Sequence, residues 1–94
     1  DVGVGGTTAD TVGRILRDRA ERSQVICVTH APQVAARAHN HMCVVKREAE
    51  TDIAALNPEQ RVEELARMLA GADVTEKTRD YAQTLLNEAH QAAK

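Results

Sequence analysis

Residues 24–36 read Q-V-I-C-V-T-H-A-P-Q-V-A-A, and this stretch decides the fold class. Residues 25–29 form a continuous apolar run rich in β-branched side chains, which is typical of a strand covered on both faces in a parallel sheet. Pro32 fits the first turn of a short helix, which the alanine-rich sequence predicts over residues 33–38. Because another helix is predicted before the run, the order helix, buried strand, helix indicates an α/β fold.

His30 follows this apolar run directly, and two roles are open to it. The carboxyl end of a parallel strand is the edge at which ligands bind in open α/β sheets. An imidazole at that edge is therefore a candidate ligand-binding or catalytic group. A lone histidine after a strand is also commonly a structural residue, so its position alone leaves both roles open.

One helix is predicted before the apolar run and two at the end of the chain. Residues 7–22 place apolar side chains on one helical stripe, namely Ala9, Val12, Leu16 and Ala20, with Ile15 beside it. The next helix begins at Asn57 with a capping-box pattern and ends at Gly71, and the last begins after Val74 with Thr75 as its cap. Their expected buried stripes are Val62, Leu65, Ala66 and Leu69, and Tyr81, Ala82, Leu85 and Ala89, with Leu86 alongside.

A strand pair is predicted between these helices. Residues 39–46 form the first strand, and residues 51–56 are a weaker extended segment that pairs with it through a polar turn at 47–50. His39, His41 and Cys43 alternate along the first strand, so their side chains would share one face. Zinc favours such ligands but needs a fourth, and no partner motif is present. The alternative is two edge histidines beside a buried cysteine, and no metal site is expected.

Length and composition limit the class of protein. The chain has 94 residues, a formal net charge of −2 and a single aromatic residue, Tyr81, so its core must be aliphatic. This length fits one small domain or a piece of a larger one. Charges of both signs are interspersed along the chain, so the charge pattern predicts no binding surface for nucleic acid or acidic lipid. No membrane span or signal peptide is visible, and Cys27 and Cys43 are expected to be reduced, buried thiols of a cytosolic protein.

The chain opens with a glycine-rich loop, D-V-G-V-G-G. A dinucleotide-binding fingerprint would need glycine in place of Thr8, and a P-loop would need a Gly-Lys pair that the sequence lacks. The loop is therefore not a phosphate cradle of either type. Its glycines would still let the backbone approach another surface closely, and the alternative is an ordinary flexible terminus.

Three stretches resemble the C-terminal end of the RecN family, the bacterial DNA-repair ATPases of the SMC/ABC class. They are D-V-G-V-G-G at residues 1–6, Q-V-I-C-V-T-H-A-P-Q-V-A-A-R-A at 24–38 and Q-R-V-E-E-L-A-R-M-L-A-G at 60–71. The resemblance covers nearly the whole chain, although the segment from Lys46 to Leu56 is shorter than the hairpin usual in the family. It implies that residues 1–94 are the C-terminal part of an ABC/SMC-type P-loop ATPase head lobe with an incomplete sheet, in the order helix, strand, helix, strand pair, two helices.

The resemblance also implies site residues. The D-loop, which in such heads reaches across the head–head dimer toward the partner's nucleotide, is matched by Asp1, Val2, Gly3, Val4 and Gly5. His30 matches the switch histidine, which hydrogen-bonds the γ-phosphate and helps to position the attacking water, a role that suits an imidazole N–H donor. The Walker A lysine, the signature motif, the catalytic glutamate and the Mg²⁺ ligands would lie outside this chain. The chain alone is therefore expected not to hydrolyse ATP.

Cofactors and partners follow from the same resemblance. The full-length protein would use ATP and Mg²⁺ in the repair and recombination of double-strand DNA breaks, in the bacterial cytoplasm and in association with the nucleoid. Its expected partners are a second ATPase head in a homodimer, the N-terminal part of the same head, and DNA, but no membrane. A different hypothesis is a self-standing helical protein-interaction module without nucleotide chemistry, whose binding surface is formed by residues 57–94.

Overall fold

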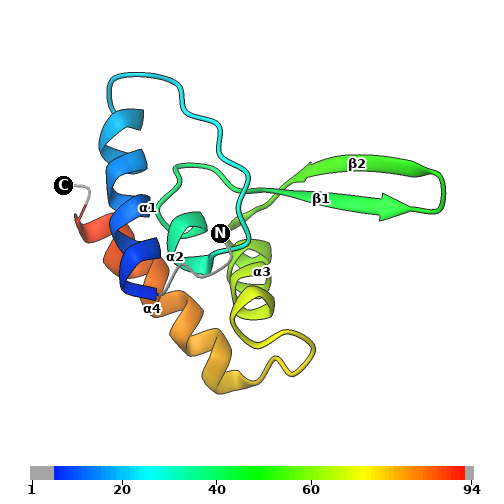
Figure 1. Cartoon of the computed structure of the whole chain (residues 1–94). Coiled ribbons are helices and arrows are strands. Elements are labelled where there is room, and N and C mark those ends of the chain that lie inside the picture. Colours follow the sequence, from blue (N-terminus) through cyan, green and yellow to red (C-terminus); the bar gives the residue numbers. More distant parts are fainter. Residues whose placement is uncertain (1–5, 93–94) are drawn as a thin grey trace.

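The computed structural model describes residues 6–92 as a helical body from which a two-stranded sheet extends (Figure 1). The elements in chain order are α1 (Gly6–Ala20), α2 (Pro32–Ala35), β1 (Met42–Arg47), β2 (Glu50–Ala55), α3 (Pro58–Ala70) and α4 (Glu76–Ala92). The α/β class and the incomplete sheet agree with the sequence prediction. Residues 1–5, which carry the predicted D-loop, lie outside the described residues.

Local capping signals set the ends of the two long C-terminal helices as predicted. The Asn57 side chain accepts a hydrogen bond from the backbone N–H of Gln60 at 2.8 Å, and the Gln60 side chain accepts one from the backbone N–H of Asn57 at 2.9 Å. Gly71 ends α3 with a φ of 67°, a left-handed value that glycine adopts without strain. The Thr75 hydroxyl accepts from the N–H of Thr78 before α4. Among the described helices, none combines the length and apolar character needed to cross a membrane.

The core lies where α2 packs onto the α3–α4 pair, and small side chains dominate it. Its buried members are Ala35, Ala36, Leu65, Ala66, Ala82 and Leu86. Leu65 is fully buried, and methyl groups around it let the helices approach closely. The predicted stripes of α3 and α4 therefore face each other and α2. Tyr81 is the exception, because it was expected in the stripe of α4 but is exposed.

The predicted strand pair is confirmed as an antiparallel hairpin that points away from the helices (Figure 1). The register pairs Val44 with Ile53, and the first strand begins at Met42 rather than at residue 39. Glu48 in the connecting turn has a φ of 49°, a left-handed conformation that is uncommon for a residue other than glycine. Both strands are largely exposed, although Cys43 and Val45 on β1 are half-buried.

The predicted buried strand over residues 25–29 is wrong for this chain as it stands. These residues have no regular secondary structure, and Ile26 and Val28 are 78% and 95% exposed. A strand forms only by hydrogen bonding to a neighbour. Within residues 6–92, β1 and β2 pair only with each other, and neither pairs with residues 25–28. Figure 1 shows the segment as an open connection that runs from the end of α1 to the start of α2.

Two further expectations fail because that strand does not form. Of the α1 stripe, Ala9 is buried, but Val12 is exposed and so is Ile15 beside it. Cys27 lies in the apolar run and is exposed instead of buried, whereas Cys43 on β1 is half-buried. Both thiols are free, as expected. Exposed large apolar side chains thus lie on α1 and on the segment that follows it, and others lie on the hairpin and on α4.

Candidate functional site

His30 lies at the junction between the apolar run and α2. Its side chain is exposed, and the next residue, Ala31, is the N-cap of α2. The backbone N–H of Ala31 donates to the Thr29 hydroxyl at 3.0 Å, which bridges across His30. The backbone carbonyl of Ala31 accepts from the N–H groups of Val34 and Ala35 at 3.1 Å each. The residue after His30 is therefore tied into the helix, and the imidazole stands at its entrance.

The opposite end of α2 is held by two arginines from other helices. The Arg61 side chain on α3 places one guanidinium nitrogen, Nη2, against three backbone carbonyl oxygens, those of Ala35 at 3.0 Å, Ala36 at 3.4 Å and Ala38 at 2.6 Å. Arg17 on α1 donates through Nη1 to the carbonyl of Arg37 at 2.7 Å. The carbonyls of Ala35 and Ala36 lie at the C-terminal end of α2, and those of Arg37 and Ala38 lie in the residues that follow it. Partial negative charge gathers at such an end, although the Ala35 carbonyl also accepts from the N–H of Ala38 at 3.3 Å. We call Arg17 and Arg61 the carbonyl clamp of α2.

Helix α1 supports α2 at a second point through Gly13. A Cβ atom at this position would lie 3.0 Å from the backbone oxygen of Gln33 and 3.0 Å from Cγ of Arg37. The absence of a side chain at Gly13 thus allows the backbones of α1 and α2 to meet. Arg37 also donates from Nη2 to the carboxylate of Asp10 on α1 at 3.0 Å. The carbonyl clamp and the glycine contact together hold α2 from two neighbouring helices.

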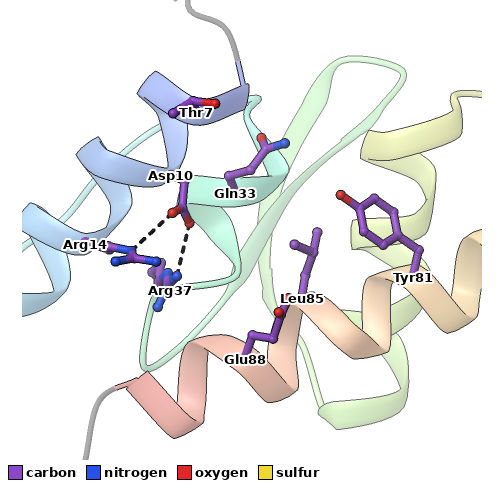
Figure 2. Close-up of a pocket in the computed structure, with 8 residues that line it drawn as sticks. All are labelled: Thr7, Asp10, Arg14, Gln33, Arg37, Tyr81, Leu85 and Glu88. Atoms are coloured by element: carbon purple, nitrogen blue, oxygen red, sulfur yellow. Dashed lines mark hydrogen bonds and ion pairs between the residues drawn. The ribbon is translucent and has the colours of Figure 1, made fainter.

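A cleft of about 490 Å³ lies between α1, the α2 region and α4 (Figure 2). Its lining residues are Thr7, Asp10, Arg14, Gln33, Arg37, Tyr81, Leu85 and Glu88. The two carboxylate oxygens of Asp10 are engaged by Arg14 at 3.1 Å and by Arg37 at 3.0 Å, which Figure 2 shows as dashed lines. Both oxygens of the Asp10 carboxylate are therefore occupied by guanidinium donors. His30 does not line this cleft, so the cleft is separate from the candidate site.

The three metal-type side chains of the predicted first strand meet different partners. His39 lies before β1, with its Nε2 atom 3.4 Å from the Glu21 carboxylate. Cys43 Sγ lies 3.5 Å from the Glu64 carboxylate. Burial, and to a smaller extent the negative charge of Glu64, raises the pKa of the Cys43 thiol. Burial and the Arg61 charge lower the pKa of His41. Among residues 6–92, no group of three or more His, Cys, Asp or Glu side chains is placed to hold a metal ion.

Sequence reasoning singled out His30 but missed Arg61, which is 8% exposed and belongs to the candidate site through α2. A signal was present, because Arg61 precedes Leu65 by four residues and therefore lies on the buried stripe of α3. A charged residue on such a stripe needs internal partners. The partners could not be read from the sequence, since they are backbone carbonyls more than twenty positions away.

Comparison of the sequence with known proteins identifies the family to which the chain belongs. No protein-family model matches the chain. Proteins named DNA repair protein RecN match it, at 47% identity in Vibrio cholerae over 92% of this chain and at 45% in Haemophilus influenzae over 96%. The Bacillus subtilis protein of the same name is 37% identical over 97% of the chain. The chain spans only 16% to 17% of the length of these relatives. It therefore belongs to the RecN family and corresponds to a C-terminal part of its members.

Proposed function

We propose that this chain is the C-terminal part of the ATPase head of a RecN-type DNA repair protein, and that His30 senses the γ-phosphate of ATP there. The observation that carries the proposal is an exposed apolar run that ends at an exposed imidazole, one residue before the N-cap of α2. Ile26 and Val28 would point to one face of a strand, and Val25 and Cys27 to the other. Both faces are apolar, which suits a strand in the middle of a parallel sheet.

The strands that would cover this run belong to the rest of the protein in the proposal. The relatives are about six times longer than the chain, as the 16% share implies, so ample sequence exists to supply them. Burying one Ile or Val side chain stabilises a fold by about 1.5–3 kcal/mol. Residues 25–29 would therefore gain both their hydrogen bonds and their cover when the head is complete, and His30 would stand at the carboxyl edge of the finished sheet.

Among the described residues, the proposal assigns one contact with the nucleotide, made by His30. The imidazole of His30 is open to solvent and can donate an N–H to a phosphoryl oxygen as negative charge develops there. In the proposal, Mg²⁺ is held by other segments of the full-length protein. ATP supplies the transferable phosphoryl group when bound. The proposed D-loop, residues 1–5, would add a contact to a second head, and the full-length protein would act on DNA in the cytoplasm, at the nucleoid.

The structure argues against the alternative of a self-standing helical interaction module, because the surface proposed for partner binding is buried. Its binding face was to be the apolar stripes of α3 and α4, but Leu65, Ala66, Ala82 and Leu86 pack against one another and against α2. A partner helix would have to displace α2 to reach them. The head proposal needs no such displacement, since the apolar side chains that it uses are already exposed.

The test is the variant His30→Ala in the full-length protein. We expect kcat for ATP hydrolysis to fall about 100-fold, the usual effect of removing one hydrogen-bond donor to transition-state charge, while the Kd for ATP changes less than about threefold. His39→Ala is the matched control, because His39 is partly exposed and pairs only with surface Glu21. Equal losses of ATP binding and turnover, or no loss of turnover, would rule out the sensor role.

A further inference from the structure

Helix α2 is too short to hold its own position. It has four residues, barely one turn, and an isolated helix of this length is not stable in water. Its order must therefore come from contacts with its neighbours. These contacts decide where His30 points, because Ala31, the residue after His30, is hydrogen-bonded into this turn.

Among these contacts, Arg61 is a buried charged residue, with 8% of its surface exposed. Its partners are the carbonyl oxygens of Ala35, Ala36 and Ala38, and no carboxylate pairs with it among the described ion pairs. Its Nε atom is buried without a hydrogen-bond partner. Burying a cation in this way is costly, and the favourable contribution comes from the carbonyls at and just after the negative end of α2.

A short, continuous path joins Arg61 to His30. Arg61 Nη2 contacts the carbonyl of Ala35, the N–H of Ala35 donates to the carbonyl of Ala31, and Ala31 is bonded to His30. The path runs through two hydrogen bonds and the backbones of Ala35 and Ala31. Movement of the α2 end would therefore displace the imidazole, and a shift of about 1 Å in a catalytic group can cost about 100-fold in rate.

We propose that Arg61 is the positioning residue of His30. It holds α2 by its carbonyl end and so fixes the direction in which the imidazole leaves the chain. This inference rests on the proposed function of His30. Arg17 assists from the other side by bonding the carbonyl of Arg37, but Arg17 also pairs with Glu21 at the surface and is the weaker anchor.

The experiment uses the full-length protein and measures kcat, the Kd for ATP and the melting temperature. Arg61→Met keeps most of the volume and the apolar stem but removes the guanidinium donor from the three carbonyls, of which that of Ala35 keeps the N–H of Ala38 as a donor. We expect kcat to fall about tenfold or more, with the Kd for ATP within about threefold. Arg61→Lys should recover part of the loss, because a lysine ammonium presents three donors on one nitrogen, as the three carbonyls require. Arg79→Met is the matched control, because Arg79 pairs at the surface with Glu63 at 2.6 Å and should leave kcat unchanged.

A double variant separates positioning from stability. In the His30→Ala background, Arg61→Met should lower kcat by less than about twofold, because the group that Arg61 positions is gone. A full additional loss in that background, or a lower melting temperature with unchanged kcat, would overturn the inference. If Arg61→Met does not fold, the same comparison is made with Arg61→Lys, whose shorter reach should lower kcat less. Failure of the proposed function looks different, since His30→Ala alone would then leave kcat unchanged.

Discussion

The helical body and the apolar run are built from similar residues but end in opposite environments. Leu65 on α3 is 0% exposed, whereas Val28 in the run is 95% exposed. The apolar side chains of the helical body are buried within the chain, because those of α2, α3 and α4 pack against one another. The run finds no partner strand within residues 6–92. Apolar sequence alone therefore specifies burial, but only the presence of a complementary surface achieves it.

The largest expected effect comes from truncating each region in the same way. In the 94-residue chain, Leu65→Ala should lower the free energy of unfolding by about 2–5 kcal/mol, because it leaves a cavity in a closed core. Val28→Ala should change it by less than about 0.5 kcal/mol, because the valine contacts little there. Urea unfolding followed by circular dichroism measures both. Similar losses from the two variants would show that the run is already buried in this chain and would break the comparison.

A smaller effect is expected where α1 meets α2. Gly13→Ala would gain about 1 kcal/mol of helix propensity but would press a methyl group onto the Gln33 carbonyl and Arg37, at a cost of about 1–3 kcal/mol. The net result should be a loss of about 1 kcal/mol, seen as a lower urea midpoint. Thr11→Ala is a control on an exposed position of the same helix. A stabilised Gly13→Ala variant would mean that the two backbones are not in close contact.

The smallest effect concerns pH and the border between the body and the hairpin. Burial and the charge of Arg61 lower the pKa of His41 below its ordinary value of 6.5, with Glu64 opposing them. The unfolded chain then binds more protons than the folded one between the two pKa values. The contribution of His41 to stability is therefore present above pH 6.5 and is lost as the pH falls through the window below it. His90 shifts in the same direction, so it adds to the effect.

The measurement is a series of urea midpoints from about pH 7.5 to about pH 5, which spans the ordinary histidine pKa of 6.5 and the values below it. His41→Gln should flatten this dependence, while His90→Gln should flatten it separately. A steeper dependence in His41→Gln than in the parent would contradict the direction of the shift. Because His41 is half-buried just before β1, its effect on stability shows whether the base of the hairpin packs against the helices.

How much the sequence predicts depends on how far apart the partners lie. The capping box at Asn57, the glycine end at Gly71 and the hairpin turn are formed by residues within a few positions, and each was predicted. The strand over residues 25–29 needs partners from distant sequence, so its pattern was read as buried although this chain leaves it exposed. Arg61 was missed for the same reason, because its acceptors are backbone oxygens that acquire their place only when α2 folds onto α3.

Most buried apolar residues described in the chain are alanines, namely Ala9, Ala35, Ala36, Ala66, Ala82 and Ala89. An alanine position has almost no volume left to lose, so shrinking substitutions have little to act on. Enlarging ones, by contrast, force apart helices that are already in contact. The six sites should therefore respond unequally to substitution: serine should be tolerated better than valine or leucine, and glycine should cost about 1 kcal/mol of helix propensity rather than packing.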